Sequence, residues 1–487
     1  MRITALARVM LLAPVAVAFG SKASHAQSDP CDPRTYGANN DGTSDNTTAI
    51  QTAIDTCAGN GGGIVPIAGG GTYISGPISL RSHILLKVVA PTILKSTLNH
   101  YAYQPAFLGY PFRFTNDPSV TGVGPSLTGK PEAFISANDA WDVGIIGDGT
   151  IDGSGGDSPP PDIDGGQSWW AMAQAVSKAA GNAPSCYSGT NITCYDPNII
   201  ATGTANSPSY AGQSFSDIPT SNGLPRPWLV EFYHCINVTV DGLLLTNSPM
   251  WNLALRYDRN VKVLNYRVVN PSDSPNTDGI DPVGTTYLTV AEADIDTGDD
   301  NIAIKSGLPG VPPGAYYAPP YNLPRLPTSY VTVVDSVFRR GHGLSVGSET
   351  VNGIWHIRAN NVQFLGTDNG FRIKTGRDRG NQIFDMVIQN LQMTDVPTPI
   401  SLSEYYPTIP SVTQSDISQP QTPDTRPFVH GITIANVDVT NPKTVRDTNV
   451  TGGLIIGVPE SPIYNVRLRN VSISSSMPGG VYMRLRN

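Results

Sequence analysis

The chain has 487 residues, of which 14% are charged and 39% hydrophobic, with 49 glycines and 42 prolines. This composition argues against a helical protein and favours a folded, turn-rich, β-dominated chain with ample material for a core. Because the formal net charge is −8, the surface would repel nucleic acid and anionic lipid, and we expect neither as a partner.

The N-terminus is typical of an exported protein. Residues 1–26 begin with Arg2 and Arg8, continue with an apolar run over 9–19 and end in a small-residue cleavage site before Gln27. A membrane anchor is the alternative, but the run is shorter than the about 20 residues that span a bilayer. We therefore expect a secreted protein, extracellular or periplasmic, whose net charge falls from −8 to −11 when the three cations of the signal peptide are removed.

The first element predicted for the mature chain is an amphipathic helix over about 46–58, with Asp45 as a possible cap. The apolar residues of one face are Ala49, Ile50, Ala53, Ile54 and Cys57. Such a helix could cover the open end of a repetitive β-structure, which would otherwise expose apolar core and strand edges.

The five cysteines suit an oxidising compartment. Proximity alone favours the pairs Cys31–Cys57 and Cys186–Cys194, whereas Cys235 lies in an apolar run and is expected to be a buried free thiol. No Cys/His spacing is typical of a zinc site, so we expect neither a metal nor a cofactor.

Short β-rich runs then recur to the end of the chain, mostly 20 to 35 residues apart and often opened by Asn or Asp. Examples are 235–242, 260–263, 361–364, 431–434 and 465–468. This loose recurrence predicts an all-β fold, a single parallel β-helix over 27–487, with a capping helix at its N-terminal end. An antiparallel sandwich is the alternative, although it seldom needs so many strands.

Two long segments interrupt the pattern at 156–227 and 308–328, and the first contains a helical patch over 167–180. Loops of this length are usually functional or disordered. Their aromatic residues could stack on sugar rings or pack the loops onto the body; these are Trp169, Trp170, Tyr316, Tyr317 and Tyr321.

Four polar blocks stand out between residues 276 and 374. They are Asn276-Thr277-Asp278-Gly279, Gly298-Asp299-Asp300-Asn301, Gly341-His342-Gly343 and Arg372-Ile373-Lys374. Asp278 and Asp299 are 21 residues apart, which matches one coil of a β-solenoid, and coils stack about 4.8 Å apart. We therefore expect Asp278, Asp299, Asp300 and His342 to line one groove.

These residue types suit the hydrolysis of a glycoside, which needs an acid to protonate the leaving oxygen and a carboxylate to activate water or to attack. Crowding of Asp278, Asp299 and Asp300 would raise at least one pKa. Arg372 and Lys374 are two residues apart and project on the same side of a strand, an arrangement that suits the carboxylate of an anionic sugar.

With these blocks the sequence resembles the polygalacturonases of glycoside hydrolase family 28, and Tyr406 in Ser403-Glu404-Tyr405-Tyr406 is a further match. The resemblance implies a right-handed parallel β-helix that hydrolyses α-1,4 links between galacturonic acid units of pectin with inversion. It implies that Asp299 is the general acid, and that Asp278 and Asp300 hold and activate the water. His342 would keep the acid protonated, and the substrate would be bound by Arg372, Lys374, Tyr406 and Asn276.

The implied inversion fits carboxyl groups about 6.5–9.5 Å apart, which one coil of separation plus side-chain reach could supply. Asn301 stands where many relatives have cysteine, and most of the cysteines of the fungal relatives are missing. We expect a monomer that binds polygalacturonate or pectin oligosaccharides.

The two long segments favour exo action, from the non-reducing end, because a loop beside the catalytic coils can turn a groove into a pocket. Endo action is the nearest alternative. The others are a rhamnogalacturonan hydrolase, a pectate lyase whose aspartates would bind calcium, and a non-catalytic β-helix that binds polysaccharide.

Overall fold

The computed structural model describes residues 29–103, 132–179, 226–307, 326–474 and 483–486, apart from 378, 407–408, 410–416, 419–425 and 447. The predicted signal peptide, the predicted pair Cys186–Cys194, and the tyrosines of the segment 308–328 lie outside these residues.

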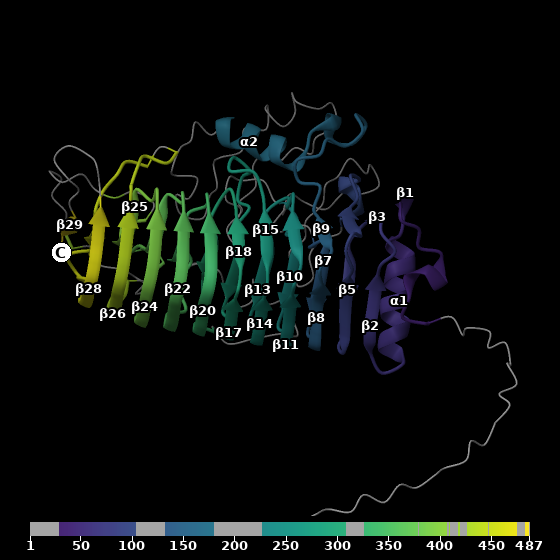
Figure 1. Cartoon of the computed structure of the whole chain (residues 1–487), viewed down its shortest axis with the longest axis horizontal. Coiled ribbons are helices and arrows are strands. Elements are labelled where there is room, and N and C mark those ends of the chain that lie inside the picture. The colour runs from purple at the N-terminus through teal and green to yellow at the C-terminus, as the bar shows by residue number, and fades with distance from the viewer. Residues whose placement is uncertain are drawn as a thin grey trace, which may run out of the picture.

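Parallel strands stack along one axis in three ladders (Figure 1). The first ladder consists of β2 (Gly63–Ile67), β5 (Ile84–Val88), β8 (Trp141–Gly147), β11 (Ile236–Asp241), β14 (Arg259–Leu264), β17 (Thr286–Ala291), β20 (Thr328–Arg339), β22 (Ile354–Leu365), β24 (Gln382–Thr394), β26 (Phe428–Thr440) and β28 (Tyr464–Ser474). The second consists of β1 (Asp41–Asp45), β3 (Thr72–Ser75), β6 (Ile93–Ser96), β9 (Thr150–Asp152), β12 (Leu244–Thr246), β15 (Arg267–Val269) and β18 (Asp294–Asp296).

The third ladder, which carries the polar blocks, consists of β4 (Ile78–Leu80), β7 (Ile135–Asn138), β10 (Val230–Tyr233), β13 (Leu253–Arg256), β16 (Ile280–Val283), β19 (Ile302–Ile304), β21 (Leu344–Gly347), β23 (Asn369–Lys374), β25 (Thr398–Ser403), β27 (Gly453–Ile456) and β29 (Met483–Arg486). The first two ladders merge at β20, which pairs with both β17 and β18. Because the pairings between these strands are all parallel, the predicted parallel β-helix is confirmed and the antiparallel sandwich is excluded.

Apolar residues of successive coils stack in register to form the core. Val263, Val290, Val333, Ala359 and Ile388 form one such column, and each is at most 1% exposed. Their neighbours along each strand point outward, which explains the two-residue alternation in the sequence. Burying one such aliphatic side chain stabilises the fold by about 1.5–3 kcal/mol.

Asparagines within the long strands β22, β24, β26 and β28 form a second, polar column. Asn390 donates to Asn360, Asn436 to Asn390, and Asn470 to Asn436, over 2.7–3.0 Å. The last three of these residues adopt left-handed backbone angles, which Asn tolerates better than most side chains. The ladder of amides therefore gives Asn a structural role at equivalent positions of these four coils.

The N-terminal end of the solenoid is covered by α1 (Thr47–Gly59), as predicted (Figure 1). Asp45 accepts a hydrogen bond from the first helical amide, that of Thr47, at 2.9 Å. The predicted apolar face is buried except for the half-buried Ala49. The predicted disulfide between Cys31 and Cys57 ties this helix to the chain before it, and Cys235 is a buried free thiol as expected.

Part of the first inserted segment lies along an edge of the central coils, where it forms η3 (Asp164–Gly166) and α2 (Trp169–Ala179) (Figure 1). Trp169 is buried and stacks on His100 of η2 (His100–Ala102) at 4.0 Å, so its ring packs the segment onto the body. A short 3-10 helix, η1 (Pro33–Tyr36), opens the described chain. In the described part of the chain, no helix is long and apolar enough to cross a membrane.

Candidate active site

The polar blocks lie at the turns through which the chain enters the third ladder. Asp278 precedes β16, Asp299 and Asp300 precede β19, and His342 precedes β21. Ile280 pairs with Ile302, so Asp278 and Asp300 occupy equivalent positions on adjacent coils. The predicted convergence of the three aspartates and His342 is what the structure shows.

The three aspartates each present a carboxylate oxygen within 4.8 Å of the others. Asp278 and Asp300 are 3% and 0% exposed, whereas the side chain of Asp299 retains 24% exposure and so is accessible to solvent. The separation is shorter than the about 6.5–9.5 Å expected for an inverting pair. The side chains thus converge from adjacent coils and bring their nearest oxygens together.

Close backbone contacts fix these turns. A Cβ on Gly341 would lie 2.4 Å from the carbonyl oxygen of Asp299, and one on Gly298 would lie 2.1 Å from that of Ser274. Asn301 donates to the carbonyls of Ile295 and Arg339 and accepts from the amide of Gly343. Only glycine fits the two close approaches, and Asn301 joins the turns through its side-chain amide.

Asp300 is held as an anion. Its two oxygens accept hydrogen bonds from Arg372 and Lys374, both at 2.6 Å, and Oδ1 also accepts from Ser345 at 2.7 Å. Burial alone would raise the pKa of Asp300, but the positive charges of Arg372 and Lys374 outweigh it and keep that pKa well below its usual range. The two cations predicted to face a substrate carboxylate thus already bind the carboxylate of Asp300.

Asp278 belongs to a second ionic group that sequence reasoning missed. Lys305 lies 3.7 Å from Asp278, 3.2 Å from Asp281 and 3.5 Å from Glu349, and its ammonium lies 4.4 Å from the ring centroid of Trp251. Burial, followed by the charges of Asp281 and Asp299, raises the pKa of Asp278 well above its usual range. Burial also raises the pKa of Asp281, to about 7. Asp278 therefore gives up its proton at higher pH than an ordinary carboxyl, beside the anionic Asp300.

His342 connects the exposed aspartate to a further carboxylate. Its Nε2 lies 3.6 Å from Asp299, and its Nδ1 lies 2.5 Å from Asp368. Burial would raise the pKa of Asp368, but the charge of His342 and their hydrogen bond lower it. Nη1 of Arg446 lies 3.4 Å from both ring nitrogens of His342 while its Nη2 donates to the carbonyl of Ser272. The imidazole is thereby fixed in orientation beside Asp299.

Asn276 occupies the rim of the same cluster. Its amide nitrogen lies 3.3 Å from Asp299, and its oxygen accepts from the buried Arg226 at 2.7 Å. Arg226 also donates to the carbonyls of Pro249 and Pro275. Arg226 comes at the end of the inserted segment 156–227, so this segment is attached directly to the turn that carries Asn276 and Asp278.

Tyr406 lies at the other side of the cluster, where it is 36% exposed and its ring centroid lies 5.6 Å from the ammonium of Lys374. Its backbone amide donates to Thr375 at 2.9 Å. A ring in this position can contact a sugar bound over Lys374.

The charges favour proton chemistry over cation binding. The three carboxylates could supply oxygen ligands, but Arg372, Lys374 and Lys305 already balance them. A further cation would meet these positive groups. The site therefore offers a buried anion, a buried carboxyl of raised pKa and a partly exposed carboxyl, those of Asp300, Asp278 and Asp299.

Comparisons with known proteins identify the family of the chain. The model of glycosyl hydrolases family 28 matches residues 197–480, more than half of the chain. An endo-polygalacturonase of Pectobacterium carotovorum subsp. carotovorum is 28% identical over 363 residues, which are 74% of this chain and 72% of that protein.

Two solved structures have the same fold. An exopolygalacturonase from Thermotoga maritima is 23% identical, with 94% of this chain and 91% of that one covered and a TM-score of 0.60. A family 28 exopolygalacturonase of Yersinia enterocolitica is 21% identical, with 94% and 77% covered and a TM-score of 0.62. At these identities they support the right-handed parallel β-helix and no finer property.

Proposed function

Because this chain belongs to glycosyl hydrolase family 28, and is therefore a glycoside hydrolase, we propose that it cleaves α-1,4 links between galacturonic acid units of polygalacturonate or pectin. The observation that carries the proposal is the cluster of three aspartates within 4.8 Å, in which Asp300 is kept ionised by Arg372 and Lys374. An anion and a retained proton in one groove are the two requirements of glycoside hydrolysis.

Each side chain then has a distinct task. Asp299 is the general acid, because it is the most exposed of the three and can reach a glycosidic oxygen above the groove. Asp300 and Asp278 hold the water, and Asp300, which is the anion of the two, accepts its proton. Since the carboxyls are crowded, the proton belongs to the cluster as a whole. His342, fixed by Asp368, orients Asp299 toward the leaving oxygen.

Inversion is the proposed stereochemical outcome, although the short spacing of the carboxyls would by itself favour retention. A retaining mechanism needs a carboxylate oxygen free to bond the sugar. Both oxygens of Asp300 accept hydrogen bonds, and Asp278 retains a proton, so neither is a ready nucleophile. Proton NMR of the first product decides this point, because an initial β-anomer from the α-link indicates inversion and an initial α-anomer refutes it.

The substrate carboxylate is proposed to bind beside Arg372, Lys374 and Tyr406. Arg372 has five N–H donors and Lys374 three, so each can bind Asp300 and still offer a donor to a uronate. A site of this kind favours the acidic polymer over its methyl ester and over a rhamnose unit.

Exo action from the non-reducing end is proposed because the inserted segment lies close to the catalytic turns. Trp170 donates to the carbonyl of Ser248 at 2.8 Å, and Gln174 of α2 donates to that of Asp273 at 3.2 Å. Arg226 anchors the end of the segment to Asn276. A segment held there can close one end of the groove.

The decisive experiment compares viscosity with the release of reducing ends from polygalacturonate. Slow loss of viscosity, with mono- or digalacturonate as the early product, is expected for exo action, and a rapid fall at few bonds cleaved means endo action. Products that absorb in the ultraviolet, or inhibition by a chelator, would instead indicate a lyase and contradict hydrolysis.

The mature protein is proposed to be a secreted monomer that starts at Gln27. N-terminal sequencing of exported protein tests the cleavage site, and its elution volume in size-exclusion chromatography tests the monomer.

A further inference from the structure

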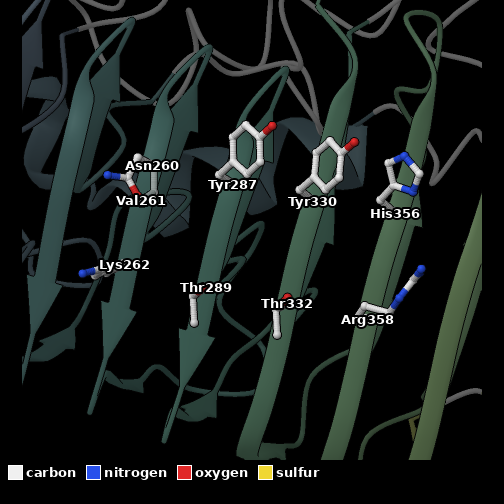
Figure 2. Close-up of a pocket in the computed structure, with 9 residues that line it drawn as sticks. All are labelled: Asn260, Val261, Lys262, Tyr287, Thr289, Tyr330, Thr332, His356 and Arg358. Carbon is white, nitrogen blue, oxygen red and sulfur yellow. The ribbon is translucent and has the colours of Figure 1, made fainter.

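A pocket of about 330 Å³ lies on the outer face of the first ladder, across β14, β17, β20 and β22 (Figure 2). It shares no residue with the catalytic cluster. Tyr287, Tyr330 and His356 project from adjacent strands and form what we call the aromatic row. Ring centroids in this row are 4.8 and 4.4 Å apart, close to the spacing of the coils.

A second row runs beside the first. Lys262, Thr289, Thr332 and Arg358 pair in register on the same four strands and form the polar row. Figure 2 shows both rows on one face of the sheet, parallel to the solenoid axis. Lys262 and Arg358 are separated by three coils, or about 14 Å. The pocket therefore presents hydroxyl groups between two cations along one direction.

The charge of this face is opposite to that of the whole chain. Arg259 lies 5.6 Å from the centroid of Tyr287, and with Lys262 and Arg358 it makes three cations. None of the residues that line the pocket is acidic, and Asp385, at its border, pairs with Arg358 and His356. In a chain of net charge −8, such a face suits an anionic ligand.

The aromatic row is exposed rather than packed away. Tyr287 and Tyr330 are 48% and 46% exposed, and both, like His356, adopt left-handed backbone angles of 56–58°. Bulky side chains rarely adopt this conformation. The rings stack on one another, so their edges and hydroxyl groups are what a ligand meets.

We propose that this outer pocket is a second, non-catalytic binding site for an acidic polysaccharide chain that lies along the solenoid axis. Carboxylates of the polymer pair with Lys262 and Arg358, while Thr289, Thr332 and the tyrosine hydroxyls bind its hydroxyl groups. The identity of the polymer as polygalacturonate rests on the proposed function. The site would keep the enzyme on its substrate between cleavage events.

Electrophoresis through gels that contain polygalacturonate tests this proposal, with Asp299→Asn as the parent so that the polymer stays intact. The double variant Lys262→Ala/Arg358→Ala should lose about fivefold or more in affinity, as expected for the loss of two exposed ion pairs. The double variant Arg81→Ala/Lys443→Ala removes the same charge from exposed sites elsewhere and should bind like the parent. Equal retardation of all three proteins, or equal losses in both double variants, overturns the proposal.

Tyr330→Asn separates binding from stability, because Asn accepts the left-handed backbone. Weaker binding with an unchanged melting temperature is expected. A lower melting temperature with unchanged binding would mean that the rings only stabilise the coils. In the wild-type background, the double variant Lys262→Ala/Arg358→Ala should retain the kcat/KM of the wild type on trigalacturonate. If the wild type hydrolyses no galacturonide, the proposed function is refuted, but the binding measured by electrophoresis stands on its own.

Discussion

Replacing Lys305 by Met should move the whole pH profile of kcat/KM to higher pH. Lys305 is 5% exposed and lies 3.7 Å from Asp278. Two unit charges about 4 Å apart interact with about 4 kcal/mol at an effective dielectric constant of about 20, which corresponds to about three pH units. Lys305 is shared with Asp281 and Glu349, so we expect a shift of about one to three units. The sign follows from the charge, since without the cation the carboxyls hold their protons more tightly.

The assay is the initial rate on polygalacturonate between pH 3 and 9, with circular dichroism to verify folding. Lys305→Arg keeps the charge and should retain the wild-type profile. Arg81→Met removes an exposed cation that pairs with Asp55 of the capping helix α1, and it should leave the profile unmoved. Breaking a buried pair costs about 3–5 kcal/mol, so the Met variant is assayed well below its melting temperature. A folded Lys305→Met protein with an unshifted profile would refute the electrostatic coupling of Lys305 to the carboxyl cluster.

Three further outcomes are expected. Asp299→Asn should fold normally and lose about 10²–10⁴-fold in turnover. A variant that keeps half of the wild-type rate would exclude Asp299 as the general acid. Arg372→Ala and Lys374→Ala should weaken action on the acidic polymer more than on its methyl ester, and equal losses would mean that they act only by holding Asp300. Burial raises the pKa of Glu404 from 4.5 to about 8, so its ionisation costs stability as pH rises from about 4.5 through 8, by at most roughly 5 kcal/mol. The melting temperature of Glu404→Gln should therefore fall less steeply with pH than that of the wild type between pH 5 and 9. Parallel curves would contradict the raised pKa of Glu404.

The sequence was sufficient to predict the ladder of coils and the convergence of the aspartates, because both depend on spacing along the chain. Asp278 and Asp300 meet since one coil separates them, and strand alternation places Arg372 and Lys374 side by side. The partner of those two cations was not predictable, because the carboxylate of Asp300 and the carboxylate of a substrate carry the same charge.

Partners that come from distant coils were also missed. Arg226 reaches Asn276 across 50 residues, and Arg446 reaches His342 across 104. Lys305 gave a weaker but usable signal. It lies two residues after Ala303, which pairs with Ser345 on the next coil, and so shares the outward face of the third ladder with Arg372 and Lys374.

The ladder of Asn360, Asn390, Asn436 and Asn470 consists of amides alone, and amides do not gain or lose protons in water. Acid therefore leaves this seam of the scaffold unchanged while it alters the carboxyl cluster in the groove. The protein should accordingly lose turnover in acid before it loses its coils, and a brief exposure to low pH should be reversible on neutralisation. This seam and the carboxyl cluster thus respond to acidity on separate scales.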